Sequence, residues 1–126
     1  MKKDVNSLNW FEIPAKNIKR SKKFYENIFG IKMEEQDMMG TKMAFFPWKE
    51  GSGKANGSVV QSDTHKPSQD GAVIYLNANP KLDKVLAKID KAGGKVVMPK
   101  TKAGDFGFMA FFIDTEGNKV ALHSQK

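Results

Sequence analysis

The feature that most restricts the fold of this chain is an internal repeat, in which two stretches of sequence follow the same plan. Each stretch begins with a short β-rich run, continues with apolar residues at helical spacing, and ends its helix at glycine. Ile18 and Leu82 lie in the two helical patterns and are 64 positions apart, and Gly30 and Gly94 are separated by the same distance. This agreement in register predicts a duplicated unit of strand, helix and further strands.

The helix of the first copy has the clearest pattern. Its apolar residues recur at helical spacing, while lysines and a glutamate occupy the opposite face. Asn17 is expected to be the N-cap, and Gly30 stands where a helix commonly ends in the left-handed conformation. The preceding run 10–13 alternates like a strand and is stopped by Pro14, and a further strand is expected over 31–35. The face predicted to be buried holds Ile18, Ser21, Phe24, Tyr25 and Ile28.

The second copy repeats this pattern with a β-rich run at 72–76 and a strand at 95–98. Between them, Pro80 stands near the predicted start of the helix, and the pair Gly93-Gly94 ends it. The apolar positions of this predicted helix are Leu82, Val85, Leu86 and Ile89.

Each copy continues into an apparent β-hairpin. In the first, the run 41–48 leads through a glycine-rich loop to 58–61, and in the second, 106–114 leads through a tight turn to 119–124. Both copies therefore follow the order βαβββ. The sequence predicts a single α+β domain, residues 1–126, in which two βαβββ modules form a curved mixed sheet around a pocket. Module one is expected over about 8–62, a linker over about 62–70 and module two over about 71–124.

Composition restricts the kinds of site that this domain can hold. The chain has no cysteine among 126 residues, which excludes disulfides and thiolate metal sites and fits a cytoplasmic protein. The net charge is +7, but the lysines are spread along the whole chain, so we expect a solvated surface and no nucleic-acid partner. No apolar run is long enough for a signal peptide or a membrane span, so we expect no membrane partner.

Strand parity separates two faces of each sheet, because successive side chains point to opposite sides. The residues expected beneath the helices are all apolar, namely Phe11, Ile13, Ile74, Leu76, Val120 and Leu122. The other parity is expected to line a pocket. Together with two further aromatic residues, these candidate ligand-binding residues are Trp10, Glu12, Phe46, Trp48, Tyr75, Asn77, Ala121 and His123.

Several stretches together carry a resemblance to a known superfamily. They are the opening WFEIPAKNIKRSKKFYENIFG, the strand MAFFPW, the segment GGKVVMPKT and the closing DTEGNKVALHS. On these motifs the chain, from about Leu8 to Ser124, resembles the vicinal oxygen chelate superfamily, also called the glyoxalase/bleomycin-resistance/extradiol dioxygenase superfamily. The resemblance implies a curved sheet that holds a divalent metal through His and Glu ligands, one from each of four strands. It also implies a homodimer.

The ligand positions implied by the resemblance can be carried over to this chain one by one. The ligand of the first strand falls on Trp10, and that of the final strand falls on Ala121. The ligand that opens module two falls on Val73 if Pro80 marks a one-residue insertion, and on Ile74 if it does not. None of these side chains has a lone pair suited to a divalent cation.

The fourth implied ligand belongs to the run 58–61, where the amide of Gln61 is the best donor. Because the loss of two ligands out of four already removes most of the affinity, we expect no metal and no cofactor. The sequence therefore favours a metal-independent member of the superfamily that binds a small apolar or aromatic molecule in its cup, without turnover, as a homodimer.

An enzyme is the alternative function. It would be a metal-dependent lyase, isomerase or dioxygenase with ligands at other positions, or a metal-free acid/base catalyst that uses His123 and Glu12. The competing interpretation of His123 is a hydrogen bond to the backbone near the end of its strand. Tyr75 and Asn77 are candidates for orienting a ligand. His65, in the linker, is expected to be solvated.

Overall fold

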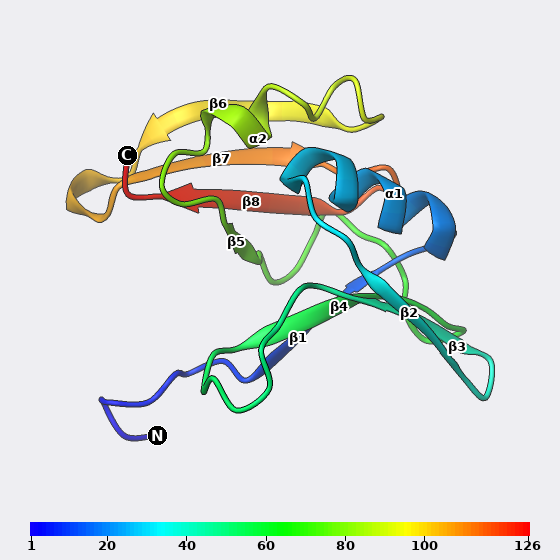
Figure 1. Cartoon of the computed structure of the whole chain (residues 1–126). Helices are drawn as coiled ribbons and strands as arrows, with labels where there is room; N and C mark the ends of the chain where they lie inside the picture. The colour runs from blue at the N-terminus through cyan, green and yellow to red at the C-terminus, as the bar shows by residue number, and fades with distance from the viewer.

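The computed structural model describes the whole chain, residues 1–126, and contains two βαβββ units (Figure 1). The first unit contains β1 (Trp10–Pro14), α1 (Ile18–Phe29), β2 (Glu34–Met38), β3 (Thr41–Phe45) and β4 (Asn56–Gln61). The second contains β5 (Tyr75–Asn77), α2 (Asp83–Leu86), β6 (Lys95–Lys102), a short 3-10 turn (Gly104–Phe106), β7 (Phe108–Ile113) and β8 (Lys119–Ser124). The predicted α+β class and the order of elements in both copies are confirmed.

The strands form two four-stranded mixed sheets with the same topology. The order is β1-β4-β3-β2 in one sheet and β5-β8-β7-β6 in the other. In each sheet the first and last strands of the unit pair in parallel, and the other neighbours pair antiparallel. β1 and β5 therefore each have one free edge.

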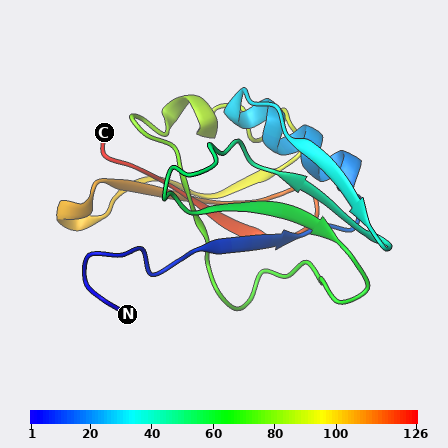
Figure 2. The same ribbon diagram turned by 60° about the horizontal axis from the view of Figure 1, so that its bottom comes forward.

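The two sheets share one apolar core, in which α1 contacts both of them. Figure 2 shows both helices on one side of the sheets and the linker after β4 on the opposite side. The ring of Tyr25 on α1 lies 5.6 Å from that of Phe46, which follows β3, and 6.5 Å from that of Phe112 on β7. Because the core takes residues from both units, neither unit buries its apolar face alone.

α1 forms where the sequence predicts it. Its N-cap is Asn17, whose Oδ1 accepts the backbone N–H of Arg20 at 3.1 Å. Its C-terminal end is Gly30, which has a φ of 65° and donates its backbone N–H to the carbonyl of Glu26. The five residues of the predicted apolar face are all buried: Ile18, Ser21, Phe24, Tyr25 and Ile28.

The helix of the second unit is shorter than its pattern predicts. Only Asp83–Leu86 is regular α-helix, and turns carry the chain on to Gly93, which has a φ of 104°. No side chain caps this helix; the backbone N–H of Leu82 instead donates to Ser124 Oγ at 3.0 Å. Leu82 and Ile89 are nevertheless fully buried, so the apolar pattern correctly identified the packed face.

Several strand bounds differ from the predicted ones: β6 continues to Lys102, beyond the expected 98, and β2 and β5 each begin three residues later than expected. β2 begins at Glu34, later than expected, because the backbone N–H groups of Ile31 and Met33 bind Glu26 at the end of α1, at 3.1 and 2.8 Å. β5 covers Tyr75–Asn77, whereas the expected run is 72–76, and it is an edge strand with β8 as its single partner.

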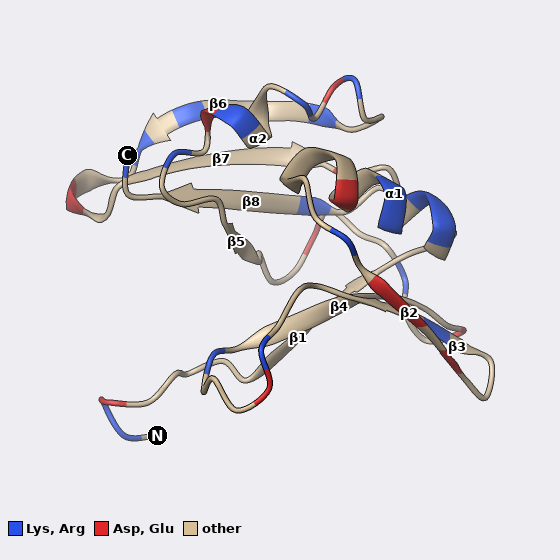
Figure 3. Cartoon of the chain, in the orientation of Figure 1, with Lys and Arg blue, Asp and Glu red and all other residues tan.

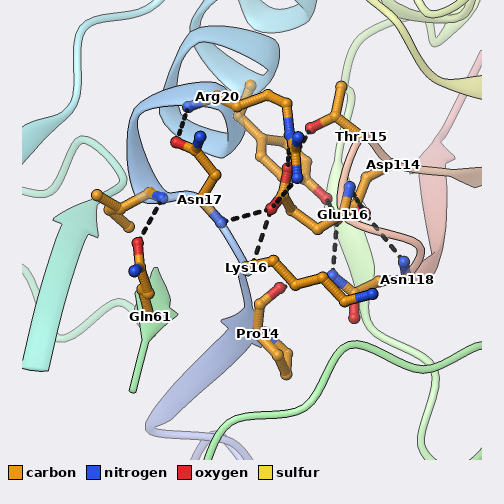
Figure 4. Close-up of polar contacts among 11 residues, drawn as sticks. Pro14, Lys16, Asn17, Arg20, Gln61, Asp114, Thr115, Glu116 and Asn118 are labelled. Atoms are coloured by element: carbon orange, nitrogen blue, oxygen red, sulfur yellow. Dashed lines mark hydrogen bonds and ion pairs between the residues drawn. The ribbon is translucent and has the colours of Figure 1, made fainter. Parts of the chain in front are cut away.

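The turn between β7 and β8 joins the two units through a buried carboxylate (Figure 4). Glu116 Oε1 accepts the backbone N–H groups of Lys16 and Asn17, both at 2.8 Å, at the start of α1. Arg20 donates to both carboxylate oxygens of Glu116, at 2.7 and 3.0 Å. Burial by itself raises the pKa of Glu116, but the hydrogen bonds from Arg20 and Asn17 outweigh it and hold the pKa below its ordinary value.

Asp114 organises the same turn from within. Its Oδ1 accepts the backbone N–H groups of Glu116 and Asn118, both at 2.9 Å, and its Oδ2 accepts the hydroxyl of Tyr25 at 2.8 Å. Burial and the charge of Asp114 raise the pKa of Tyr25 well above its ordinary value. The acidic residues of this turn therefore hold α1 against the second sheet and are not available to a ligand.

Candidate functional site

The two units are related residue by residue, which identifies equivalent positions on their strands. Ala15 donates its backbone N–H to the carbonyl of Val60 at 2.8 Å, and Ala78 donates to that of His123, also at 2.8 Å. Ala78 follows Ala15 by 63 positions, and His123 follows Val60 by the same number. The additional position that gives a spacing of 64 at Leu82 therefore lies between Ala78 and Leu82.

The spacing of 63 residues decides between Val73 and Ile74 as the metal-ligand position that the family resemblance implies at the start of the second unit. Trp10 on β1 corresponds to Val73 and not to Ile74, because Val73 is the residue 63 positions after Trp10; it lies two residues before β5. Ala121 corresponds in the same way to Ser58 on β4. The four equivalent positions are thus Trp10, Ser58, Val73 and Ala121.

These four side chains do not fit a divalent metal ion. Three of them have no donor atom for a cation, and the fourth, Ser58, offers one neutral hydroxyl that is buried without a hydrogen-bond partner. The amide oxygen of Gln61 is occupied, since it accepts the backbone N–H of Ile18 at 2.8 Å. Nowhere in residues 1–126 do three His, Cys, Asp or Glu side chains come together as a set of metal ligands.

An apolar cavity of about 750 Å³ lies between β1 and β5, and we call it the inter-sheet cleft. Hydrophobic side chains make up 11 of its 14 lining residues. Phe11 contributes from β1, Tyr75 and Asn77 from β5, and Phe29 and Ile31 from the end of α1. A cavity of this size and character is typical of sites that hold small apolar molecules.

A second cavity, of about 670 Å³, adjoins the cleft on the first sheet, and we call it the aromatic hollow. Four of its ten lining residues are the aromatic Trp10, Phe45, Phe46 and Trp48, and the others include Glu34, Gln36 and Glu50; Phe46 lines the inter-sheet cleft as well. The rings of Trp10 and Phe45 are 5.8 Å apart and tilted by 56°. Lys32 also lines the hollow. Aromatic walls at this spacing offer surfaces on which a flat ring can stack.

The structure brings five of the eight candidate ligand-binding residues to these two cavities. Trp10 and Trp48 line the hollow, Tyr75 and Asn77 line the cleft, and Phe46 lines both. Three candidates line neither cavity: Glu12, Ala121 and His123.

Ala121 and His123 are engaged within the second sheet. Ala121 is fully buried and is paired with Tyr75 on one neighbouring strand and with Phe111 on the other. The Nε2 of His123 hydrogen-bonds to the backbone carbonyl of Phe106, so its partner is the backbone, as one of the two interpretations of this residue expects. No hydrogen bond joins His123 to Glu12 in the chain.

Glu12 instead pairs with His65, which is partly exposed and hydrogen-bonded rather than fully solvated. The Nε2 of His65 lies 2.8 Å from Glu12 Oε1, and the side chain of His65 is only 25% exposed. The linker that follows β4 brings these two residues together although they are 53 positions apart in the sequence. No local pattern relates two such residues, and therefore sequence reasoning missed the pair.

Charged residues are spread over the chain; three of them, Lys32, Glu34 and Glu50, line the aromatic hollow, and none lines the inter-sheet cleft. Figure 3 shows lysine and arginine on helices, strands and loops of both units, with acidic residues among them. Lys19 and Lys22, for example, both bind Glu35, at 2.7 and 3.4 Å. Neither helix has the length and apolar character that are needed to cross a membrane.

The sequence matches a known family over nearly its whole length. The model of the Glyoxalase/Bleomycin resistance protein/Dioxygenase superfamily matches residues 7–122. The Mycobacterium tuberculosis protein named "Putative glyoxylase CFP32" is 29% identical over 119 residues, which cover 90% of this chain and 44% of that protein. The chain thus spans less than half the length of this curated relative.

Solved structures with low sequence identity have the same fold. A glyoxalase/bleomycin resistance protein from Albidiferax ferrireducens T118 has a TM-score of 0.73 at 16% identity, covering 96% of this chain and 100% of its own. The antibiotic binding protein TnmS3 from Streptomyces sp. CB03234 has a TM-score of 0.64 at 20% identity, covering 99% and 100%. Both likenesses concern the fold alone.

Proposed function

Because the chain belongs to the glyoxalase/bleomycin resistance protein/dioxygenase superfamily, we propose that it is a metal-independent member that binds a small molecule. The ligand is apolar or aromatic, and it occupies the inter-sheet cleft and the aromatic hollow. The protein binds this ligand without converting it. The name of the solved relative TnmS3, an antibiotic binding protein, shows that this fold is compatible with such a function.

The observation that carries this proposal is that two neighbouring cavities share part of their lining. Both are lined by Phe46 and Asn56, and between them they present the rings of Phe11, Trp10 and Trp48. An extended ligand with one flat ring can therefore place the ring in the hollow and an apolar group in the cleft. Removing these apolar surfaces from water supplies binding free energy.

The donor chemistry supports binding without a metal. At the four equivalent strand positions only one hydroxyl, that of Ser58, has a lone pair, and one neutral donor does not hold a divalent ion against water. The metal-free enzyme is also less well supported, because the hydrogen bonds of Glu12 and His123 lead to different partners. An acid and a base that act together require a shared substrate position.

Titration with the fluorescent dye 8-anilino-1-naphthalenesulfonate tests the proposed site. Trp48→Ala removes one wall of the hollow, and we expect dye binding to weaken about tenfold because a stacking surface is lost. Phe106→Ala is the matched control, since Phe106 is also aromatic and exposed but lines neither cavity. Equal dye affinities for the two variants would contradict the proposed binding site.

We expect the protein to be a homodimer, as the family resemblance implies. The free edges of β1 and β5, together with the exposed Leu8 and Tyr75 at the cleft, are surfaces that a second copy can cover. Light scattering after size-exclusion chromatography should give twice the chain mass of 14.1 kDa. A cytoplasmic location stays a prediction from the absence of cysteine.

A further inference from the structure

A series of hydrogen bonds connects the linker to the wall of the aromatic hollow. In the linker, the Nδ1 of His65 lies 2.6 Å from Ser62 Oγ. Across the same imidazole ring, Nε2 lies 2.8 Å from Glu12 Oε1 on β1. The other carboxylate oxygen, Glu12 Oε2, accepts the indole N–H of Trp10 at 3.2 Å. We call Ser62, His65, Glu12 and Trp10 the linker relay.

The chemistry of these side chains sets the direction of each bond. An ionised carboxylate only accepts, so the Nε2 of His65 carries the proton that is donated to Glu12. In neutral imidazole Nδ1 is then the acceptor, and the hydroxyl of Ser62 donates to it. Ser62 Oγ also accepts the backbone N–H of Thr64 at 3.2 Å, which fixes the turn that presents His65.

Glu12 depends on these two partners for its orientation. Within residues 1–126, the hydrogen bonds and ion pairs of its side chain are those with Trp10 and His65. The Glu12 side chain is 36% exposed. A partly exposed carboxylate that loses one partner gains water in its place, and its orientation toward the indole is then no longer fixed by the protein.

Trp10 is the ligand-facing end of the linker relay. It lines the aromatic hollow beside Phe45, and the only hydrogen-bond partner of its indole N–H is Glu12. A ring whose orientation is set before binding loses less conformational freedom when a ligand stacks on it. The affinity of the hollow for a flat ligand therefore depends on what holds Glu12.

We propose that His65 is a positioning residue of the aromatic hollow: it holds Glu12, and through Glu12 the indole of Trp10, in the orientation on which a planar aromatic ligand stacks. This inference rests on the proposed binding function and adds a linker residue to it. By thermodynamic reciprocity, a ligand that stabilises this orientation of Trp10 also stabilises the contact between the linker and β1.

The test uses the full chain carrying Trp48→Phe, because Trp10 is then the only tryptophan of the two in the sequence. Fluorescence anisotropy of Trp10 reports the mobility of the indole, and titration with 8-anilino-1-naphthalenesulfonate reports binding. His65→Leu removes both hydrogen bonds of the imidazole, whereas His65→Gln retains a donor for Glu12. Asp83→Asn, which breaks a surface ion pair with Lys100, is the matched control.

We expect His65→Leu to lower the anisotropy of Trp10 and to weaken dye binding about fivefold, because the indole becomes mobile. His65→Gln and Asp83→Asn should both stay within about twofold of the parent. A purely structural role of His65 would lower the melting temperature without changing the anisotropy of Trp10 in the folded protein. Unchanged anisotropy in a folded His65→Leu variant would therefore overturn the proposal.

Two further variants keep the test decisive. If His65→Leu does not fold, Glu12→Gln replaces it, since one amide oxygen cannot accept both bonds of the carboxylate, and unchanged anisotropy and dye binding would again overturn the proposal. Trp10→Ala distinguishes an error about the role of His65 from an error about the binding site. If Trp10→Ala weakens dye binding but His65→Leu leaves dye binding and the Trp10 anisotropy unchanged, only the role of His65 is rejected. If Trp10→Ala and Trp48→Ala both bind the dye as tightly as the parent, the binding site itself is rejected.

Discussion

At the scale of single residues, polar side chains in this protein mainly join segments that are distant along the chain. Glu116 in the turn before β8 binds the backbone at Lys16 and Asn17, and Gln61 binds that of Ile18. All three backbone groups stand at the start of α1, where a helix has N–H groups without partners of its own. The position of α1 against both sheets thus depends on two side chains from outside the helix.

Acid stability tests the contribution of Glu116. Because its pKa in the folded protein lies below the ordinary value of 4.5, the ionised carboxylate contributes stability above about pH 4.5, and this is lost as the pH falls through the lowered value. We expect the free energy of unfolding to drop over this range in the wild type. Glu116→Gln should lose about 2 kcal/mol at pH 7 and show less of this acid dependence.

The matched control for Glu116→Gln is Glu35→Gln, which removes a surface carboxylate that binds Lys19 and Lys22. A pair of this kind contributes about 0.5 kcal/mol, so this variant should be close to the wild type at pH 7. Urea unfolding at several pH values measures both effects. Equal losses for the two variants would mean that the buried position of Glu116 confers no particular stability.

Some residues of the candidate site were predictable from the sequence, and others were not. Strand parity predicts Trp10 as a site residue and aromatic character predicts Phe46 and Trp48, and all three line the aromatic hollow. His65 was not identified, because its partner Glu12 is 53 positions away and the path of the linker decides the contact. Residue type and strand register are local properties, whereas partners in a hydrogen-bond network depend on the tertiary structure.

At the scale of elements, the pairing of β1 with β4 depends on a close contact at Gly57. Phe11 is its partner across the two strands, and a Cβ at position 57 would lie 2.5 Å from both the ring and the carbonyl oxygen of Phe11. The Phe11 ring in turn lies 5.6 Å from that of Phe46. Glycine is therefore required here by the space that an aromatic ring occupies over the strand.

Substitution at Gly57 tests this packing. We expect Gly57→Ala to destabilise the protein by about 3 kcal/mol, because the added methyl group meets backbone as well as side-chain atoms. Gly30→Ala is the comparison, since Gly30 has a φ of 65° but open space around a Cβ, and it should cost about 1 kcal/mol. Chemical denaturation of both variants gives the two values, and a larger loss for Gly30→Ala would contradict this assignment.

Elements with local signals were predictable from the sequence, and elements held by distant contacts were less so. α1 has its own cap, its own terminating glycine and a continuous apolar face, and it forms as predicted. α2 lacks a capping side chain and is regular for only four residues, because Leu82 is held by Ser124 on β8. The β5 strand is also shorter than its β-rich run, and its three residues pair with β8.

At the scale of the whole molecule, the two units share one core and one hydrogen-bond network. Their shared core includes Tyr25 from the first unit and Phe112 from the second, and the network around Glu116 crosses between them. Such interdependence predicts a single unfolding transition. The duplication in the sequence revealed the two units but not this coupling, because a repeat pattern does not specify how its copies pack.

Two probes measure this cooperativity, because both tryptophans, Trp10 and Trp48, lie in the first unit. Tryptophan fluorescence reports unfolding of that unit, and far-ultraviolet circular dichroism reports both units. We expect the two urea transitions to coincide. An earlier transition by fluorescence than by circular dichroism would show that the first unit unfolds independently.

The central claim, that this superfamily member works without a metal, is tested most directly by measuring bound metal. The purified protein is incubated with Ni²⁺, Zn²⁺, Fe²⁺ or Mn²⁺, desalted and analysed for metal content, with its melting temperature recorded before and after. Since Trp10, Ser58, Val73 and Ala121 offer no set of donors, we expect far less than one ion per chain and no rise in melting temperature. One tightly bound ion per chain, with a rise in melting temperature that a chelator reverses, would contradict the claim.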